Sequence, residues 1–293
     1  MLVYETHHEA FYSCSLQNSL PKTLVDQNWL VESGAVSAKM RSRDPSRGRS
    51  PVCHDKRDAC LPKFSIIVPV FNEALLIRPF LAHLRERAPG AEIIVADGGS
   101  SDGTVELATG FCDQLVKSEC NRAVQMNAGA RAAKGDVLWF LHVDAEIPQG
   151  CLNQITRIID DPTVVGGYFR IRLPRGFVYR LTDTFAHYAG ILLRMRCGDH
   201  GLFCRRTAFL DIGGFPEVPL MEDVEFFRRL HRHGTIRYID RRLRVNPRRY
   251  EAIGRLRLTL AYGLIASLYI LGFPLPRLAA VYKLLCCQRA ERA

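Results

Sequence analysis

The chain has 293 residues, which is enough for one large domain or two small ones with a full hydrophobic core. Its 40 basic and 30 acidic residues give a net charge of +10, and residues 228–257 alone contain eleven arginines and two acids. A surface of this kind suits phosphates, nucleic acid or an anionic membrane. The ten cysteines are scattered and form no pair of CxxC motifs, which argues against the zinc-finger classes.

Residues 1–62 differ in composition from the rest of the chain. They keep no apolar period, and residues 41–51 form a low-complexity basic run. Such a segment cannot bury enough apolar area to offset its chain entropy. It is either an arm that binds nucleic acid or lipid headgroups, or a dispensable disordered leader, and we favour the leader. The sequence therefore divides into a leader (1–62), a main domain (63–250) and a C-terminal helical segment (251–293).

Short apolar strands alternate with helical patterns through the first part of the main domain. This alternation predicts an α/β fold with a mostly parallel, Rossmann-like sheet flanked by helices. After Pro148 the alternation weakens, although two more helices and two more strands are expected before a helix that starts near Met221. The predicted strands of the first part are Phe64–Val70, Glu92–Ala96, Leu115–Val116 and Val137–Val143.

Two carboxylates follow the last of these strands. Asp144 and Glu146 come directly after the apolar run that begins at Val137, at the end of the strand where open α/β sheets bind ligands. Side chains at i and i+2 of an extended segment point the same way, so both acids could hold one cation. A hard cation held by one or two protein carboxylates and by substrate phosphates is a usual Mg²⁺ arrangement. A solvated acidic turn is the alternative.

Two further features suit a nucleotide. The glycine-rich turn at residues 97–104 lets backbone amides approach a ligand closely, and Asp97 could accept a base or ribose hydroxyl. Its glycines match neither GxGxxG nor a Walker loop. Arg122 opens a helix, where an arginine is well placed for a diphosphate. An ordinary tight turn and a surface arginine are the alternatives.

Two polar positions later in the chain could take part in chemistry. His200, in the turn at residues 198–201, could ligate a cation or hydrogen-bond a phosphate. Glu222 and Asp223 stand at the start of a helix, where the dipole and free amides should keep a carboxylate ionised. An ionised carboxylate near an acceptor hydroxyl can act as general base. A histidine without a ligand and plain helix-start charges are the alternatives.

The segment Leu258–Leu275 carries no charge and is flanked by Arg255, Arg257 and Arg277. Eighteen helical residues reach roughly 27 Å, just short of a bilayer core. The segment is a short or re-entrant membrane helix, an interfacial anchor or a buried core helix. We expect membrane contact, because a charge-free run with arginine flanks suits an anionic leaflet.

Six blocks in chain order resemble the family 2 glycosyltransferases with a type A fold. The likeness covers residues 63–250, and it is nearest to a branch of small single-domain bacterial proteins similar to diaponeurosporenoate glycosyltransferase. Arg248, Arg249 and Tyr250 stand where processive relatives carry a Gln-x-x-Arg-Trp motif, but the glutamine spacing is missing. The blocks are SIIVPVFNE at 65–73, DGGSSDGT at 97–104, RAVQMNAG at 122–129, LHVDAE at 141–146, GDHG at 198–201 and MEDV at 221–224.

The resemblance implies an inverting glycosyltransferase that uses Mg²⁺ or Mn²⁺. The sugar would pass from a nucleotide-diphosphate donor to an acceptor hydroxyl or carboxylate, with lipids among the candidate acceptors. The implied location is the cytoplasmic face of the cell membrane, with the membrane surface but no nucleic acid as a partner. The implied roles are donor binding by Pro69, Val70, Glu73, Asp97, Arg122 and Asp144, metal binding by Asp144 and Glu146, and general base for Asp223 with Glu222 as its competitor.

Two other functions are alternatives to this one. A sugar-nucleotide nucleotidyltransferase would carry a Gly-x-Gly-Thr-Arg-like loop with a downstream lysine, where this chain has residues 70–73 (VFNE). A non-enzymatic module that uses its basic surface would have the charge, but the sequence lacks interleaved aromatics and a nucleic-acid recognition motif.

Overall fold

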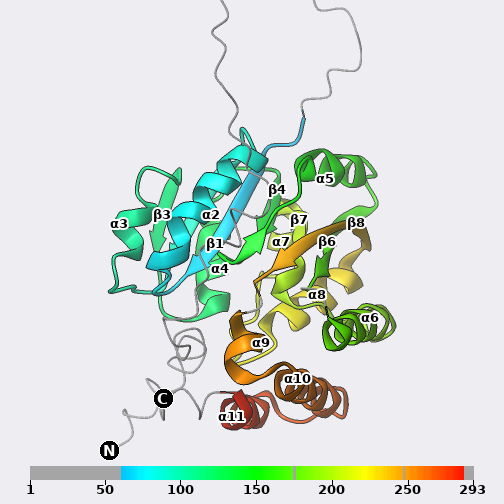
Figure 1. Ribbon diagram of the computed structural model, residues 1–293. Helices are drawn as coiled ribbons and strands as arrows, with labels where there is room; N and C mark the ends of the chain where they lie inside the picture. The colour runs from blue at the N-terminus through cyan, green and yellow to red at the C-terminus, as the bar shows by residue number, and fades with distance from the viewer. Residues whose placement is uncertain (1–60, 174–175, 247, 287–293) are drawn as a thin grey trace, which may run out of the picture.

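The computed structural model describes residues 61–173, 176–246 and 248–286. All but the last two residues of the predicted leader therefore lie outside the described residues. The described chain forms one mixed sheet of eight strands in the order β3-β2-β1-β4-β7-β6-β8-β5, with helices on both faces (Figure 1). The predicted α/β class is confirmed, with more antiparallel pairing than expected.

The first half of the sheet is parallel, as the sequence predicts. β1, β2 and β4 are buried on both faces, which explains their continuous apolar character, whereas the edge strand β3 is only partly buried. Val70 pairs with Asp97, so the carboxyl ends of β1 and β2 lie side by side. The elements are β1 (Phe64–Val70), α2 (Ala74–Arg87), β2 (Glu92–Asp97), α3 (Thr104–Ala108), β3 (Gln114–Lys117), α4 (Arg122–Ala132) and β4 (Val137–Phe140).

The second half pairs differently. β7 is antiparallel to both β4 and β6, and β8 runs parallel to β6. β8 has no counterpart among the predicted strands, because four of its eleven residues are arginines and only Ile239 and Leu243 are buried. The elements are β5 (Ala145–Glu146), α5 (Cys151–Ile159), β6 (Val164–Arg172), α6 (Phe177–Leu192), η3 (Gly198–His200), β7 (Phe203–Arg205), α7 (Arg206–Asp211), α8 (Glu222–His233) and β8 (Thr235–Val245).

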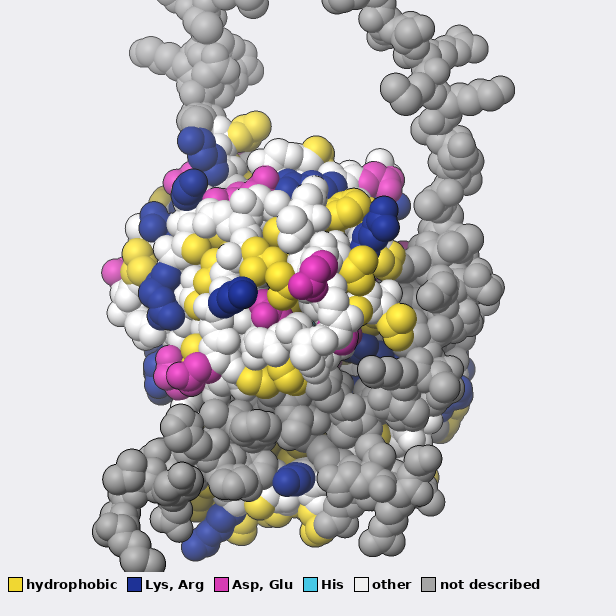
Figure 2. All heavy atoms as spheres, turned by 90° about the vertical axis from the view of Figure 1, so that its left-hand side faces the viewer, with side chains coloured by type: hydrophobic (Ala, Val, Ile, Leu, Met, Phe, Trp, Pro, Cys, Tyr) yellow, Lys and Arg dark blue, Asp and Glu magenta, His cyan; other side chains and the backbone are white. Residues whose placement is uncertain are grey.

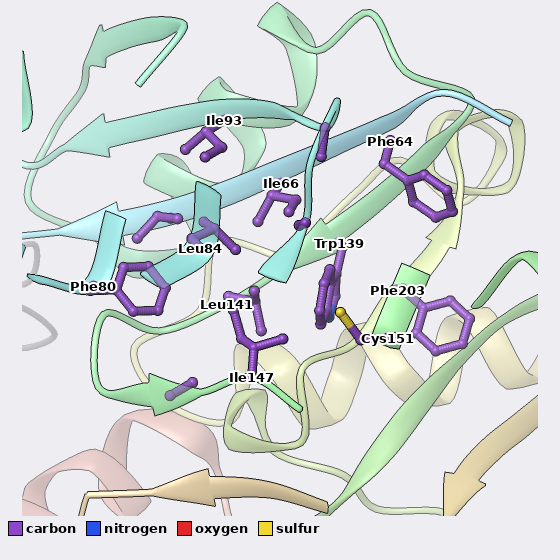
Figure 3. Packing of buried hydrophobic residues seen from close by; sticks show 14 of the residues in the cluster. Phe64, Ile66, Phe80, Leu84, Ile93, Trp139, Leu141, Ile147, Cys151 and Phe203 are labelled. Atoms are coloured by element: carbon purple, nitrogen blue, oxygen red, sulfur yellow. The ribbon is translucent and has the colours of Figure 1, made fainter. Parts of the chain in front are cut away.

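Each face of the sheet carries its own core. On the α2 and α5 side, Trp139 lies in the core between Leu141 and Phe203 (Figure 3). Its ring stacks on Phe169 at 5.3 Å between centroids, and its Nε1 donates a hydrogen bond to the Gly201 carbonyl. On the α4, α7 and α8 side, Phe215 and Phe226 stack at 3.9 Å. Burying each large apolar side chain contributes about 1.5–3 kcal/mol. The two cores therefore hold the strands in place, and with them the polar residues that follow the carboxyl ends of β1 and β4.

Helix α4 ties the strand ends together. Its buried Gln125 donates hydrogen bonds to the carbonyls of Val70 at 2.7 Å and Ala96 at 3.0 Å. Asn121 caps the helix by accepting from the Ala123 amide at 2.9 Å. These bonds fix the edge from which Asp97 and Arg122 emerge.

Three helices, α9 (Arg248–Ile253), α10 (Arg255–Ile270) and α11 (Leu275–Cys286), end the described chain (Figure 1). The expected apolar segment is not one helix, because Gly272 adopts a left-handed φ of 79° just before Pro274. Ile265 and Tyr269 of α10 pack against α11, so part of the segment is core. None of the helices in the described part of the chain has the length and apolar content that a bilayer crossing needs.

Candidate active site

A pocket lies where β1 and β4 end, and α9 and α10 close its other side. It holds about 600 Å³ of empty space, part of it open to solvent. The sheet side contributes residues at the ends of β1 and β4, and the helical side contributes two arginines and two tyrosines. The lining side chains include Pro69, Glu73, Arg122, His142, Asp144, Asp199, Arg248, Arg249, Tyr250 and Tyr262.

Arg248 from α9 reaches across the pocket to the sheet. Its guanidinium donates two hydrogen bonds to the Glu73 carboxylate, at 3.0 and 2.8 Å, and its Nη2 lies 3.7 Å from Asp144 Oδ2. Burial raises the pKa of Glu73, and the bonds from Arg248 oppose that rise. Arg248 therefore holds together the carboxylates that follow β1 and β4.

Asp144 and Glu146 have different partners. Residues 142–147 alternate between partly buried and buried, so Asp144 and Glu146 are both partly exposed while Val143 and Ala145 are buried. However, Glu146 pairs with Arg244 of β8 at 3.2 Å and is not among the residues that line the pocket. A turn at residues 143–144, closed by the Ala145 amide on the His142 carbonyl, interrupts the extended geometry. Only Asp144 of the two faces the pocket.

Arg122 lines the pocket from the start of α4, as the sequence predicts for a ligand-facing arginine. Its Nη1 lies 3.3 Å from the Glu222 carboxylate. The Nε atoms of Arg122 and Arg248 are both buried without a hydrogen-bond partner among the described residues. Buried donors without acceptors are costly, and an anionic ligand in the pocket would satisfy them. The donor set thus suits a diphosphate.

Asp97 supports the loops beside the pocket. Its carboxylate accepts the amides of Gly99 at 3.0 Å and Ser100 at 3.1 Å. The same turn joins the loop after β1, where Thr104 Oγ1 accepts the Glu73 amide at 2.8 Å. Neither Asp97 nor Val70 is among the lining residues of the pocket. Both hold the loop that presents Glu73.

Asp223 and Glu222 begin α8, and neither is among the residues that line the pocket. Asp223 accepts the amides of Gly198 at 2.5 Å and Val224 at 2.7 Å, and Glu222 pairs with the lining Arg122. Burial, with the Glu222 charge next in size, raises the pKa of Asp223 to about 7. The helix start predicts an ionised carboxylate, but the pKa of Asp223 is raised because desolvation outweighs the two amides.

His200 does not line the pocket. Its ring packs edge-to-face on Tyr168 at 5.9 Å, and Nδ1 lies 3.3 Å from the Cys197 carbonyl. Burial lowers the pKa of His200 to about 3, so the ring is neutral near pH 7. The lining histidine is His142, which sequence reasoning missed. Within the described ranges, no three side chains of His, Cys, Asp or Glu are grouped to hold a metal by themselves.

Tyrosines form the helical wall of the pocket. Tyr250 of α9 and Tyr262 of α10 line it, and Tyr262 stacks on Tyr282 of α11 at 6.3 Å. Tyr179 of α6 packs edge-to-face on Tyr250 at 5.4 Å. The only sequence signal for this wall was the Arg248-Arg249-Tyr250 run in place of a relative's motif. Contacts between these rings therefore join α6, α9, α10 and α11 beside the pocket.

The family model of glycosyl transferase family 2 matches residues 65–212, just over half of the chain. The glycosyltransferase AglE of Haloferax volcanii is 31% identical over 172 residues. That match covers 53% of this chain and 57% of AglE. The chain thus spans little more than half the length of this curated relative.

Two solved structures share the fold. The mannosyltransferase PcManGT from Pyrobaculum calidifontis, solved with GDP-Man and Mn²⁺, has a TM-score of 0.53 and 20% identity, covering 79% of this chain and 72% of that one. Glucosyl-3-phosphoglycerate synthase from Mycobacterium tuberculosis, solved with Mn²⁺, UDP and glucosyl-3-phosphoglycerate, has a TM-score of 0.52 and 17% identity, covering 73% of this chain and 81% of that one. At these identities the likeness concerns the fold.

Proposed function

The chain belongs to glycosyl transferase family 2, and we propose that it moves a sugar from a nucleotide-diphosphate donor to an acceptor hydroxyl with inversion. One observation carries the proposal. Asp144 stands in the turn that follows β4, in a pocket that also contains the buried, partly unpaired guanidinium groups of Arg122 and Arg248. A carboxylate between two such cations suits a cation and a diphosphate bound together.

Donor binding would exchange one set of charge pairs for another. The donor phosphates would accept from Arg122 and Arg248, whose Nε atoms have no partner among the described residues. Arg248 would then loosen its hold on Glu73 and Asp144, and Asp144 would be free to hold Mg²⁺ or Mn²⁺. The bound cation would neutralise charge on the leaving diphosphate. Glu146 and His200 have other partners, and no role is proposed for them.

Transfer would be a single displacement. The acceptor oxygen bonds to the anomeric carbon while the nucleoside diphosphate leaves with the electron pair of the broken bond. Asp223 takes the hydroxyl proton, and a pKa of about 7 suits a base that works near neutral pH. Burial, Glu222 and Arg122 together set that pKa. The residues that orient donor and acceptor supply most of the rate enhancement.

The test is nucleotide release from a panel of nucleotide sugars by the full-length chain. We expect release with at least one donor, loss of release with a chelator, and loss in Asp144→Asn. The matched control is Asp240→Asn, an exposed aspartate that pairs with Arg170 far from the pocket lining. Release that persists unchanged in Asp144→Asn, or in excess chelator, would refute the metal-assisted site.

A further inference from the structure

Helix α10 exposes a stripe of leucines. Leu256, Leu260, Leu264 and Leu271 are 62%, 63%, 46% and 80% exposed. The first three are spaced four residues apart, so they line one face of the helix, and Leu271 follows its end. Monomeric soluble proteins rarely keep a contiguous apolar stripe in water. Nothing among the described residues covers it.

The neighbouring helix α6 adds to this surface. The Thr182 and Thr259 hydroxyls lie 3.2 Å apart, so α6 runs alongside α10 at the lower right of Figure 1. Near its end α6 exposes Tyr188, Ile191 and Leu192. Two adjacent helices therefore turn apolar side chains outward at one end of the molecule.

The charged residues of α10 and α11 themselves have one sign. Residues 252–286 contain no aspartate or glutamate, and their four charged residues are all basic. The face at the α3 and β3 end of the sheet, in contrast, mixes hydrophobic, basic and acidic side chains (Figure 2). An apolar stripe on helices whose own charged residues are all cations is complementary to an anionic lipid surface. The cations are Arg255, Arg257, Arg277 and Lys283.

The same helix also lines the pocket. Tyr262 faces into the pocket, whereas Leu260 and Leu264, two residues away on either side, face outward. A helix with its side chains is about 10–12 Å across. A surface in contact with the leucines would therefore lie within about one helix diameter of the pocket.

We propose that the leucine stripe of α10, with the apolar end of α6, docks the protein on an anionic phospholipid surface and so delivers a lipid-borne acceptor to the pocket. The docking step stands on the exposed face alone, whereas the acceptor step rests on the proposed function. The helices would lie on the headgroups, in agreement with their lack of a bilayer-crossing length.

The test is co-sedimentation of the full-length chain with vesicles of phosphatidylglycerol and phosphatidylcholine, compared with phosphatidylcholine alone. We expect binding to the anionic vesicles that weakens as salt rises. The double variant Leu260→Glu with Leu264→Glu should bind more than about tenfold more weakly, since each leucine loses its burial in lipid. Arg257→Glu should weaken binding to anionic vesicles and leave the small binding to neutral ones unchanged.

The matched control is Leu210→Glu, an equally exposed leucine of α7 on another part of the molecule. It should bind vesicles as the wild type does, and all variants should keep the wild-type melting temperature. Wild-type protein that stays in the supernatant, or a double variant that still binds, would overturn the proposal. A solution dimer that the double variant disperses would overturn it too, since the stripe would then bind a second copy.

Two readouts separate this proposal from the proposed function. The double variant should release nucleotide from the donor at the wild-type rate with a soluble acceptor or water, because neither leucine lines the pocket. Vesicle binding without nucleotide release would refute the proposed function and leave the docking step standing. Nucleotide release without vesicle binding would refute docking alone.

Discussion

The two sides of the pocket are built in different ways. On the sheet side, Glu73 and Asp144 follow strands that are fully buried, and the buried Gln125 locks two of the strand ends. On the helical side, Arg248 comes from α9 and Tyr262 from α10, and α10 carries exposed leucines on its outer surface. The sheet side fixes positions through backbone and core, whereas the helical side closes the pocket with long side chains.

This difference suggests that the two sides have different roles in binding and catalysis. A group on a rigid strand end can hold a cation or donor at a fixed place, which catalysis by positioning needs. Arginines and tyrosines of α9 and α10 can change partners when a ligand arrives, because long side chains carry their polar groups into the pocket.

The carboxylates at the start of α8 give the largest expected effect. Asp223→Asn should lower turnover by roughly 10²- to 10⁴-fold with donor affinity unchanged, because it removes a base and not a donor contact. Glu222→Gln should mainly weaken the hold on Arg122, and so raise the donor KM more than it lowers kcat. Steady-state kinetics of both variants decide the assignment. If Glu222→Gln is the variant that stops turnover with affinity intact, the base is Glu222.

The pH profile of Asp223 offers a second measurement. With a pKa of about 7, its carboxylate ionises as pH rises through 7, so turnover should climb about tenfold per pH unit below that point. Stability should move the other way. The folded state keeps the proton that the unfolded chain loses near pH 4, so the free energy of unfolding should fall as pH rises from about 4 to 7. In Asp223→Asn that part of the slope should vanish.

Arg248 tests the helical side. Arg248→Ala should weaken donor binding by roughly ten- to a hundredfold, the worth of a charged hydrogen bond to phosphate. It should also destabilise the protein, because it leaves the buried Glu73 without its partner. Arg244→Ala is the control, since Arg244 pairs with Glu146 outside the pocket lining. Tighter donor binding in Arg248→Ala, measured by titration calorimetry, would mean that Arg248 only blocks the pocket.

Substitutions at two glycines would compare the packing of the sheet side with that of the helical side. A Cβ on Gly129 of α4 would lie 2.5 Å from Cγ2 of Ile67 in the sheet, whereas a Cβ on Gly263 of α10 would meet nothing within 4 Å. Gly129→Ala should therefore cost about 1–3 kcal/mol of stability. Gly263→Ala should gain up to about 1 kcal/mol, since alanine is the better helix former. Urea unfolding measures both, and equal effects at the two sites would contradict the contrast between a tightly packed and an open side.

The sequence predicted the sheet side well and the helical side poorly. Strands β1, β2 and β4 are continuous apolar runs, and the position of Asp144 at a strand end follows from them. The bond between Glu73 and Arg248 joins residues 175 positions apart, and no local pattern signals such a contact. β8 was missed because arginines outnumber its buried residues, and its pairing with β6 overrides its polar composition.

The pKa values of Asp223 and His200 also depend on contacts between distant parts of the chain, which the sequence does not reveal. A helix start should keep Asp223 ionised, but its burial depends on η3, α4 and α8 meeting in space. The sequence also made His200 a candidate ligand, whereas its ring packs against Tyr168. The leader and the proposed membrane location stay predictions, the first because it lies outside the described residues.

The most direct measurement of the account is the thermal stability of the full-length chain titrated with a nucleoside diphosphate and Mn²⁺. We predict stabilisation by about 2.7 kcal/mol at a hundred times the dissociation constant. That stabilisation should need both components, survive in Asp223→Asn and Asp240→Asn, and be lost in Asp144→Asn. Stabilisation that is equal in Asp144→Asn and wild type, or that is absent from wild type with every nucleoside diphosphate and Mn²⁺, would contradict a donor site at the end of β4.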